Sequence, residues 1–139
     1  MGSLFNKLLK EKPEEKDNIQ KDLLKTIQKI SGRKTISYIS NFRTHPHNMI
    51  NFDDKTFVTM LVESVKKSDK IDFILHSPGG FAEETEMIVN ILRRRFKNIR
   101  FIVPHSAKSA ATMLAFSGNE ILMCPSAELG PIDPQVSGP

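Results

Sequence analysis

Apolar residues recur along this chain with two periods, every three or four positions in some stretches and on alternate or consecutive positions in others. The first stretch carries a helical stripe of four aliphatic residues: Ile19, Leu23, Ile27 and Ile30. The pair Ser31-Gly32 follows it, and glycine is typical of the position that ends a helix. Between Thr35 and Ser40 apolar residues alternate with serines, which predicts a strand. Residues 41–51 show neither period and are interpreted as a loop.

Downstream of this loop, three predicted helices alternate with three predicted strands. The helices cover about residues 53–67, 83–97 and 108–116, and the strands cover 71–76, 100–103 and 120–123. Strictly alternating strands and helices favour an α/β fold with a mostly parallel sheet, helices on its faces and right-handed crossovers. We therefore expect an α/β domain over residues 35–139, preceded by a basic amphipathic helical arm over residues 1–34. The last residues, 125–139, are expected to be irregular.

The charge of the chain is concentrated in this arm. The 139 residues carry a formal net charge of +4, with nine Lys/Arg against five Asp/Glu in residues 1–34 and eleven of each in residues 35–139. A neutral main body argues against nucleic acid as a partner, because phosphate-binding faces need clustered basic residues. The apolar stripe of the arm fits packing on its own domain or on a sister subunit, and a peripheral contact with an anionic membrane is the alternative.

Composition also narrows the compartment and the chemistry. The single cysteine, Cys124, cannot form an internal disulfide, and no apolar run approaches the ~18 residues of a membrane span, so we expect a cytoplasmic protein. The pair His45 and His47 lacks the further ligands of a metal site. Dinucleotide, P-loop and zincin motifs are absent from the sequence, so neither a metal nor a cofactor is expected.

Two predicted strand-to-helix turns carry the candidate chemistry. The first is Ser77-Pro78-Gly79-Gly80, and the second runs from His105 to Thr112. Such turns meet at the carboxyl ends of parallel strands, where ligands usually bind. Backbone N–H groups of a glycine pair and of a helix start can hold the negative oxygen that forms during acyl transfer. The plainer alternatives are an ordinary tight turn and a serine, Ser106 or Ser109, that only caps its helix.

Three ordered segments resemble one superfamily. The segments Leu75–Gly80, Ala107–Thr112 and Cys124–Pro134 together resemble the Clp protease and crotonase superfamily, and within it the serine dehydrogenase proteinases, prokaryotic relatives of signal peptide peptidase A. The similarity covers about residues 35–135 and omits the arm. It implies a Clp protease/crotonase-like fold, and because domains of this superfamily are usually longer, it implies a domain that continues past Pro139.

The resemblance also implies roles for individual residues. Ser109 corresponds to the nucleophile, and the N–H groups of Gly80 and Ala110 correspond to the oxyanion hole, with Gly79 in the turn that forms it. No histidine stands in residues 130–134, where a Clp-type subunit has its catalytic histidine. Signal peptide peptidase relatives pair the serine with a lysine instead, which in that group lies downstream of the segment ending here.

No residue of this chain is identified as that base. Lys108 is adjacent to Ser109, but consecutive helical residues point about 100° apart, which makes Lys108 a poor base. His76 and His105 follow two predicted strands and can reach the site, although a polar residue at a strand end is the commoner role.

These observations predict a serine peptidase that acts on a peptide or protein substrate by a Ser-Lys mechanism without a cofactor. Because relatives assemble into rings or stacks, the resemblance also implies a homo-oligomer. Two alternatives stay open. One is a crotonase-like acyl-CoA enzyme that uses the same oxyanion hole, and the other is a non-catalytic oligomeric module that binds peptides or membranes.

Overall fold

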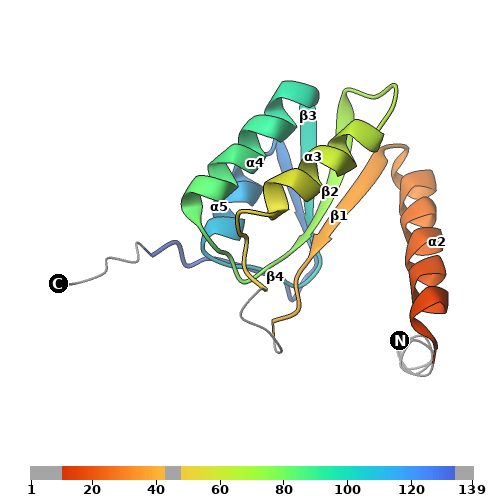
Figure 1. Cartoon of the computed structure of the whole chain (residues 1–139), viewed down its shortest axis with the longest axis horizontal. Coiled ribbons are helices and arrows are strands. Elements are labelled where there is room, and N and C mark those ends of the chain that lie inside the picture. Colours follow the sequence, from red (N-terminus) through yellow and green to blue (C-terminus); the bar gives the residue numbers. More distant parts are fainter. Residues whose placement is uncertain (1–10, 43–47, 134–139) are drawn as a thin grey trace.

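The computed structural model describes residues 11–42 and 48–133 (Figure 1). The first ten residues, the pair His45 and His47, and the last six residues lie outside the described part. The helices are α2 (Pro13–Ser31), α3 (Asp54–Ser64), α4 (Ala82–Arg95) and α5 (Ala110–Phe116). The strands are β1 (Lys34–Ile39), β2 (Lys70–His76), β3 (Asn98–Val103), β4 (Ser106–Ala107), β5 (Glu120–Met123) and β6 (Glu128–Leu129).

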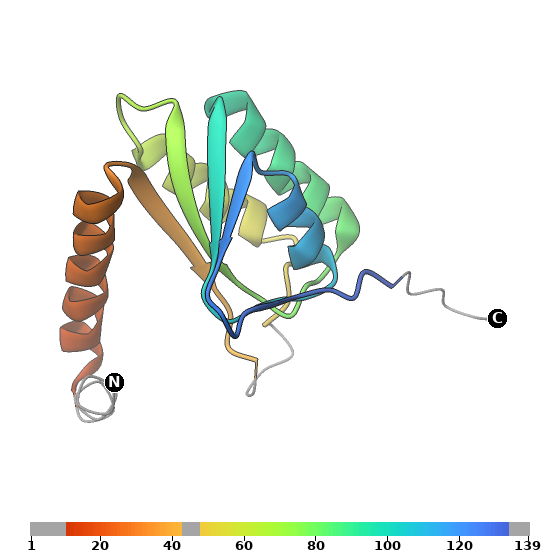
Figure 2. The ribbon, with the colours of Figure 1, turned by 180° about the vertical axis from the view of Figure 1, so that it is seen from behind.

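Four parallel strands form the main sheet in the order β1-β2-β3-β5, which confirms the predicted α/β fold. The order in space equals the order along the chain, and right-handed crossovers in one direction place every connecting helix on the same face. Figure 1 shows α3 and α4 over that face, and α5 packs beside α4. Seen from behind, strands β1, β2 and β3 lie uncovered by the helices of the described part (Figure 2).

The hydrophobic core lies between the sheet and these three helices. Phe73 and Phe101 face each other in neighbouring strands, with their rings 5.2 Å apart, and both are fully buried. The helices add Val58, Ile88 and Leu114, each at most 1% exposed. Burial of these side chains holds the carboxyl ends of the strands, and the turns that follow them, in place.

Several boundaries and one segment differ from the sequence-based expectation. Helix α4 ends at Arg95 rather than Lys97, and β3 begins at Asn98 rather than Arg100. Helix α3 ends at Ser64 rather than near Lys67, because Val65 is already extended and Lys67 has a positive φ of 54°. Helix α5 begins at Ala110 rather than Lys108, because Ser109 has a φ of 49° that a right-handed helix does not contain. Ser106 and Ala107 form the short strand β4, which pairs in parallel with β6. The expectation of an irregular tail is therefore wrong for residues 128–129, where a two-residue strand is too short to show a period.

The arm forms the predicted helix but stands apart from the body beside β1 (Figures 1 and 2). Its ends carry local signals, with Pro13 in the first helical position and Gly32 in the left-handed conformation of a C-cap. No residue of α2 is buried, and Leu23 and Ile30 of the apolar stripe are 42% and 82% exposed. Ile19 and Ile27 are partly exposed, so the described body buries no residue of the stripe. No helix in residues 11–42 and 48–133 is long and apolar enough to cross a membrane.

An ion cluster joins the end of the arm to the sheet. The carboxylate of Asp72 in β2 is fully buried and forms two ion pairs. Nε of Arg33 lies 2.6 Å from Oδ1, and Nη2 of Arg100 donates to Oδ2 at 2.8 Å. Nη2 of Arg33 also donates to the carbonyl oxygens of Ile71 and Asn98. A buried charge is tolerated only when it is paired in this way, so the cluster anchors the chain where the arm meets the domain.

Candidate active site

The two turns that carry the candidate chemistry lie against each other at the carboxyl end of the sheet. A Cβ atom on Gly79 would stand 2.8 Å from Cβ of Ser109 and 2.7 Å from the carbonyl oxygen of Lys108. Gly79 also has a φ of +109°, a backbone conformation that residues with a side chain rarely adopt. Only glycine fits here, and its small size is what lets the glycine turn touch the serine turn.

Ser109 has an unusual backbone conformation. Its φ of 49° and ψ of −125° lie outside the regions that residues with a side chain normally occupy. Its N–H donates to the carbonyl oxygen of Pro131 at 3.1 Å, which ties the strained residue to the segment after β6. Backbone strain of this kind clusters at functional sites, and a strained turn between strand and helix also presents the serine of a nucleophile elbow.

The hydroxyl of Ser109 is free within the described part of the chain. Ser109 occupies the N-cap position of α5, yet its side chain makes no capping hydrogen bond, and the residue is partly exposed. A serine that served only as a cap would bond an N–H of the first helical turn. The capping role considered from the sequence therefore does not account for Ser109.

Each of the two turns contains a backbone N–H group that is free to bind an oxygen atom. In the described residues, the N–H groups of Gly80 and Ala110 have no hydrogen-bond partner, whereas the N–H of Gly79 donates to Oγ of Ser77 at 3.2 Å. The amide of Ala110 is the first of α5, so it has no acceptor within the helix. Unpaired backbone donors in two turns that touch are the kind of group an oxyanion hole requires, and Gly79 lies where the two turns meet.

Three residues that the sequence did not single out hold these turns. Ile50 is fully buried in the segment interpreted as a loop, donates its N–H to the carbonyl oxygen of Gly79 at 2.7 Å and accepts from the N–H of Phe81 at 3.0 Å. Ser77 is also fully buried. The hydroxyl of Thr112 makes two hydrogen bonds: it donates to the carbonyl oxygen of Ala107, and it accepts from the N–H of Gly130. Ser77 and Thr112 lie in the segments that carry the resemblance, but the sequence assigns them no supporting role, and Ile50 has no periodic signal by which it could be found.

The basic groups near the site have other partners. Nζ of Lys108 donates to Oε2 of Glu128 at 2.6 Å, and this ion pair lowers the pKa of Glu128. An ammonium used as a donor has no lone pair with which to accept a proton from Ser109. The geometry thus gives Lys108 a role in holding β4 near β6.

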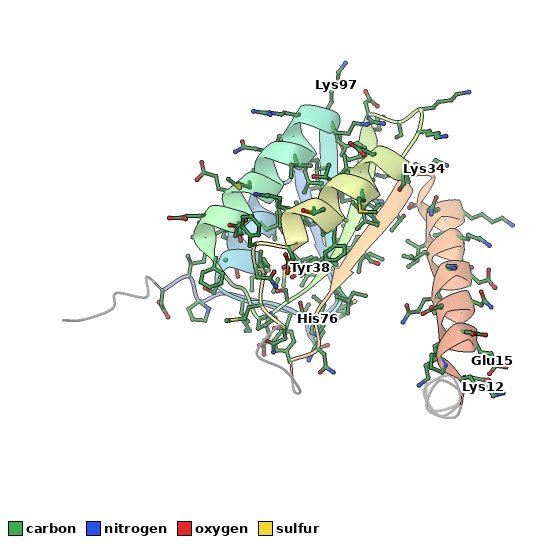
Figure 3. All side chains as sticks on the ribbon, viewed as in Figure 1. Lys12, Glu15, Lys34, Tyr38, His76 and Lys97 are labelled. Atoms are coloured by element: carbon green, nitrogen blue, oxygen red, sulfur yellow. The ribbon has the colours of Figure 1, made fainter. Side chains whose placement is uncertain are left out.

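His76 and His105 lie close together at the carboxyl end of the sheet. Figure 3 shows His76 at this end, with Lys34 and Lys97 at the other end. The His76 and His105 rings lie 5.5 Å apart, and Nδ1 of His76 lies 3.1 Å from the carbonyl oxygen of Ser106. Burial lowers the pKa of His76, the ring of which stacks on Phe42. Neither ring bonds Ser109 in the described structure. In residues 11–42 and 48–133, no group of three His, Cys, Asp or Glu side chains is arranged to hold a metal ion.

Comparison with protein families gives one match that spans nearly the whole chain. The model of the family described as ClpP-like SDH-type serine proteinase matches residues 7–138. Two uncharacterized proteins of Methanocaldococcus jannaschii are similar in sequence. MJ0137 is 29% identical over 81% of this chain and 43% of its own length, and MJ1495 is 31% identical over 65% of this chain and 31% of its own length. The chain thus spans less than half the length of these relatives.

Solved structures show the same fold. The ClpP protease catalytic domain of Plasmodium falciparum matches with a TM-score of 0.54 at 18% identity, over 76% of this chain and 60% of that one. A mutant ClpP1 of Listeria monocytogenes matches with a TM-score of 0.52 at 16% identity, over 67% of this chain and 51% of that one. At such identities the likeness concerns the fold alone, and it confirms that the fold is ClpP-like.

Proposed function

The chain belongs to the ClpP-like SDH-type serine proteinase family, and on this premise we propose that it hydrolyses peptide bonds with Ser109 as the nucleophile. Oγ of Ser109 attacks the carbonyl carbon of the substrate and forms a new C–O bond, while its proton passes to a base. The N–H groups of Gly80 and Ala110 bind the oxygen that becomes negative. The tetrahedral species then expels the amine, which takes up the proton, and water hydrolyses the acyl-enzyme.

One observation carries this proposal, namely that Ser109 has a strained backbone, a free hydroxyl and a Cβ atom that lies against Gly79. A serine that had only a structural role would not need a backbone conformation that costs of order 1–3 kcal/mol. The unpaired amides belong to Gly80 and Ala110, which directly follow the two residues in contact, Gly79 and Ser109, and this supports a shared role for them. Attack by the hydroxyl and stabilisation of the oxyanion are then served by neighbouring groups.

The base of the proposed mechanism is a lysine outside the described residues. Lys108, the lysine adjacent to Ser109 in the sequence, is held by Glu128. The resemblance to signal peptide peptidase relatives places a catalytic lysine downstream of Pro139. Such a lysine must be neutral to accept the serine proton, which requires burial away from water.

The experiment that tests the proposal is labelling with a small fluorophosphonate, which reacts with activated serines. We expect mass spectrometry to find the probe on Ser109, and we expect Ser109→Ala to abolish labelling. Ser106→Ala is the matched control, because Ser106 precedes the same helix but is 5% exposed, and it should keep the label. Labelling that persists in Ser109→Ala would reject Ser109 as the nucleophile. No labelling of the longest natural form of the protein would reject the peptidase proposal and favour a non-catalytic module.

A further inference from the structure

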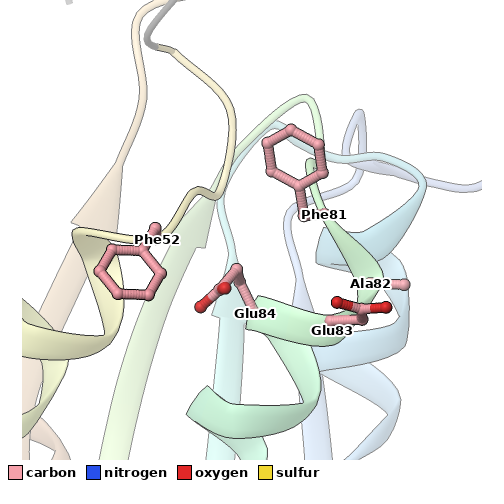
Figure 4. A pocket seen from close by; sticks show the side chains of 5 residues that line it. All are labelled: Phe52, Phe81, Ala82, Glu83 and Glu84. Atoms are coloured by element: carbon pink, nitrogen blue, oxygen red, sulfur yellow. The ribbon is translucent and has the colours of Figure 1, made fainter.

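Next to the glycine turn lies a cleft that the proposed mechanism does not use. It has a volume of about 450 Å³ and is lined by five residues: Phe52, Phe81, Ala82, Glu83 and Glu84. Figure 4 shows the rings of Phe52 and Phe81 on two sides of the cleft, with the carboxylate of Glu84 between them. We call it the Phe52–Phe81 cleft. Both rings are largely exposed, at 66% and 61%, so a ligand can reach them without unfolding any element.

Glu84 gives the cleft a hydrogen-bond acceptor that has no donor. Its Oε2 is buried from solvent and has no hydrogen-bond partner in the described structure. A buried carboxylate oxygen without a partner is unfavourable, because it has lost water and gained nothing in exchange. Glu83, exposed beside it, adds a second negative charge to the same cleft. A group that is both cationic and a donor would satisfy this site.

The aromatic rings suit the same kind of group. The face of an aromatic ring attracts an ammonium or guanidinium ion through its quadrupole. The structure already shows this at Phe52, where Nζ of Lys55 lies 4.2 Å from the ring centroid. Two rings and a carboxylate together favour a Lys or Arg side chain, whose apolar stem packs on the rings. Its charged end reaches the carboxylate when the partly exposed side chain of Glu84, which lines the cleft, turns its covered oxygen outward.

The cleft is built onto the turn that would hold the oxyanion. Residues Ile50 and Gly80 form a parallel bridge, and Phe52 and Phe81 follow them in their respective segments. Because Gly79 touches Ser109 and adjacent Cα atoms are about 3.8 Å apart, the Cα of Phe81 lies within roughly 12 Å of Cβ of Ser109. That span equals three to four residues of an extended peptide at about 3.3 Å each. A peptide that reacts at Ser109 can therefore place a nearby side chain in the cleft.

We infer that the Phe52–Phe81 cleft binds a lysine or arginine side chain of the peptide substrate, close to the bond that is cut. The inference rests on the proposed peptidase function and adds a substrate class to it. Selectivity comes from the buried Glu84 oxygen, which an uncharged side chain of equal length leaves unpaired.

The test measures how well peptides protect Ser109 from the small fluorophosphonate. Two blocked hexapeptides are compared, both of alanine except for one central residue, which is lysine in one and norleucine in the other. Because the peptide is otherwise uniform, it can slide until its one distinct side chain enters the cleft. We expect half-protection by the lysine peptide at a concentration about tenfold lower than by the norleucine peptide.

Glu84→Gln should bring the two peptides to within twofold of each other. Glu86→Gln is the matched control, because it removes the same charge from an exposed residue of the same helix that does not line the cleft, and it should keep the tenfold preference. Thermal melting of both variants checks that they fold.

The possible failures are distinct. Labelling of Ser109 with equal protection by both peptides, or a preference that survives Glu84→Gln, overturns the inference and leaves the peptidase proposal standing. Absence of labelling overturns the proposed function and, with it, this inference.

Discussion

Helices α2 and α5 differ in almost every respect that determines why a helix forms. Helix α2 has 19 residues and buries none of them, whereas α5 has seven residues and buries five. Helix α2 has a proline at its start and a left-handed glycine at its end, and α5 starts at the strained Ser109 without a side-chain cap. An isolated seven-residue helix is not stable in water, so α5 exists because the core holds it.

This difference corresponds to two different roles: α5 supports the candidate active site, and α2 forms the arm. A serine with a strained backbone needs surroundings that enforce its geometry, and the buried face of α5 provides them. The arm meets no such demand, since its stripe touches little of the described body. We propose that the stripe is covered in an assembly of several copies, and four predictions test the contrast.

The largest effect is expected at the ion cluster that joins the arm to the sheet. Asp72→Ala leaves the guanidinium groups of Arg33 and Arg100 side by side without their buried partner. The free energy of unfolding should fall by about 4 kcal/mol, measured by urea denaturation. Glu63→Ala, an exposed carboxylate on α3, should change it by less than about 0.5 kcal/mol. A loss below about 1 kcal/mol in Asp72→Ala would mean that the cluster does not hold the fold.

The next prediction compares the two helices directly. Leu114→Ala removes a side chain of α5 that is 1% exposed, and it should lower the free energy of unfolding by about 3 kcal/mol. Leu23→Ala makes the same change in α2 and should cost less than about 0.5 kcal/mol when the protein is dilute enough to be monomeric. Equal losses in the two variants would show that the body stabilises both helices alike.

A smaller effect is expected on association. Leu23→Asp combined with Ile27→Asp places two charges in the apolar stripe and should raise the dissociation constant of the proposed homo-oligomer at least tenfold, or about 1.4 kcal/mol. Light scattering coupled to gel filtration measures it, with Lys21→Asp on another face of the helix as the control. A wild-type protein that is monomeric at all concentrations contradicts the proposal. Salt-sensitive binding of the monomer to anionic liposomes would then favour the membrane alternative.

The smallest effect concerns His76. Burial lowers its pKa below the ordinary value of 6.5, so the unfolded chain takes up a proton at this residue at a higher pH than the folded protein does. The contribution of neutral His76 to the free energy of unfolding should therefore be complete above about pH 7 and be lost as the pH falls through 6.5 and below. We expect His76→Gln to lose less stability than the wild type between pH 7 and 5.5, by about 1–2 °C in melting temperature. Lys97→Gln, which alters an exposed side chain at the opposite end of the sheet, is the control and should show the pH dependence of the wild type.

How far the sequence reaches can be judged from single residues. The stripe that contains Ile27 and the alternation around Ile36 predicted a helix and a strand that the structure confirms, because period follows from local geometry. Ile50 carries no such signal, since its burial depends on pairing with Gly80, thirty residues away. The buried oxygen of Glu84 was equally hidden, because a glutamate in the first turn of a helix usually lies in solvent.

The sequence by itself determined the alternation of strands and helices, the concentration of basic charge in the arm and the three segments that point to the family. These depend on the order and type of neighbouring residues, which a linear pattern contains. The alternation also predicted that the glycine turn and the serine turn share one end of the sheet. Only the tertiary structure decided that Gly79 is in direct contact with Ser109, that the serine is strained with a free hydroxyl, and that no residue of the arm helix is buried. Each of these depends on contacts between segments far apart in the chain, and such contacts exist only after the core has packed.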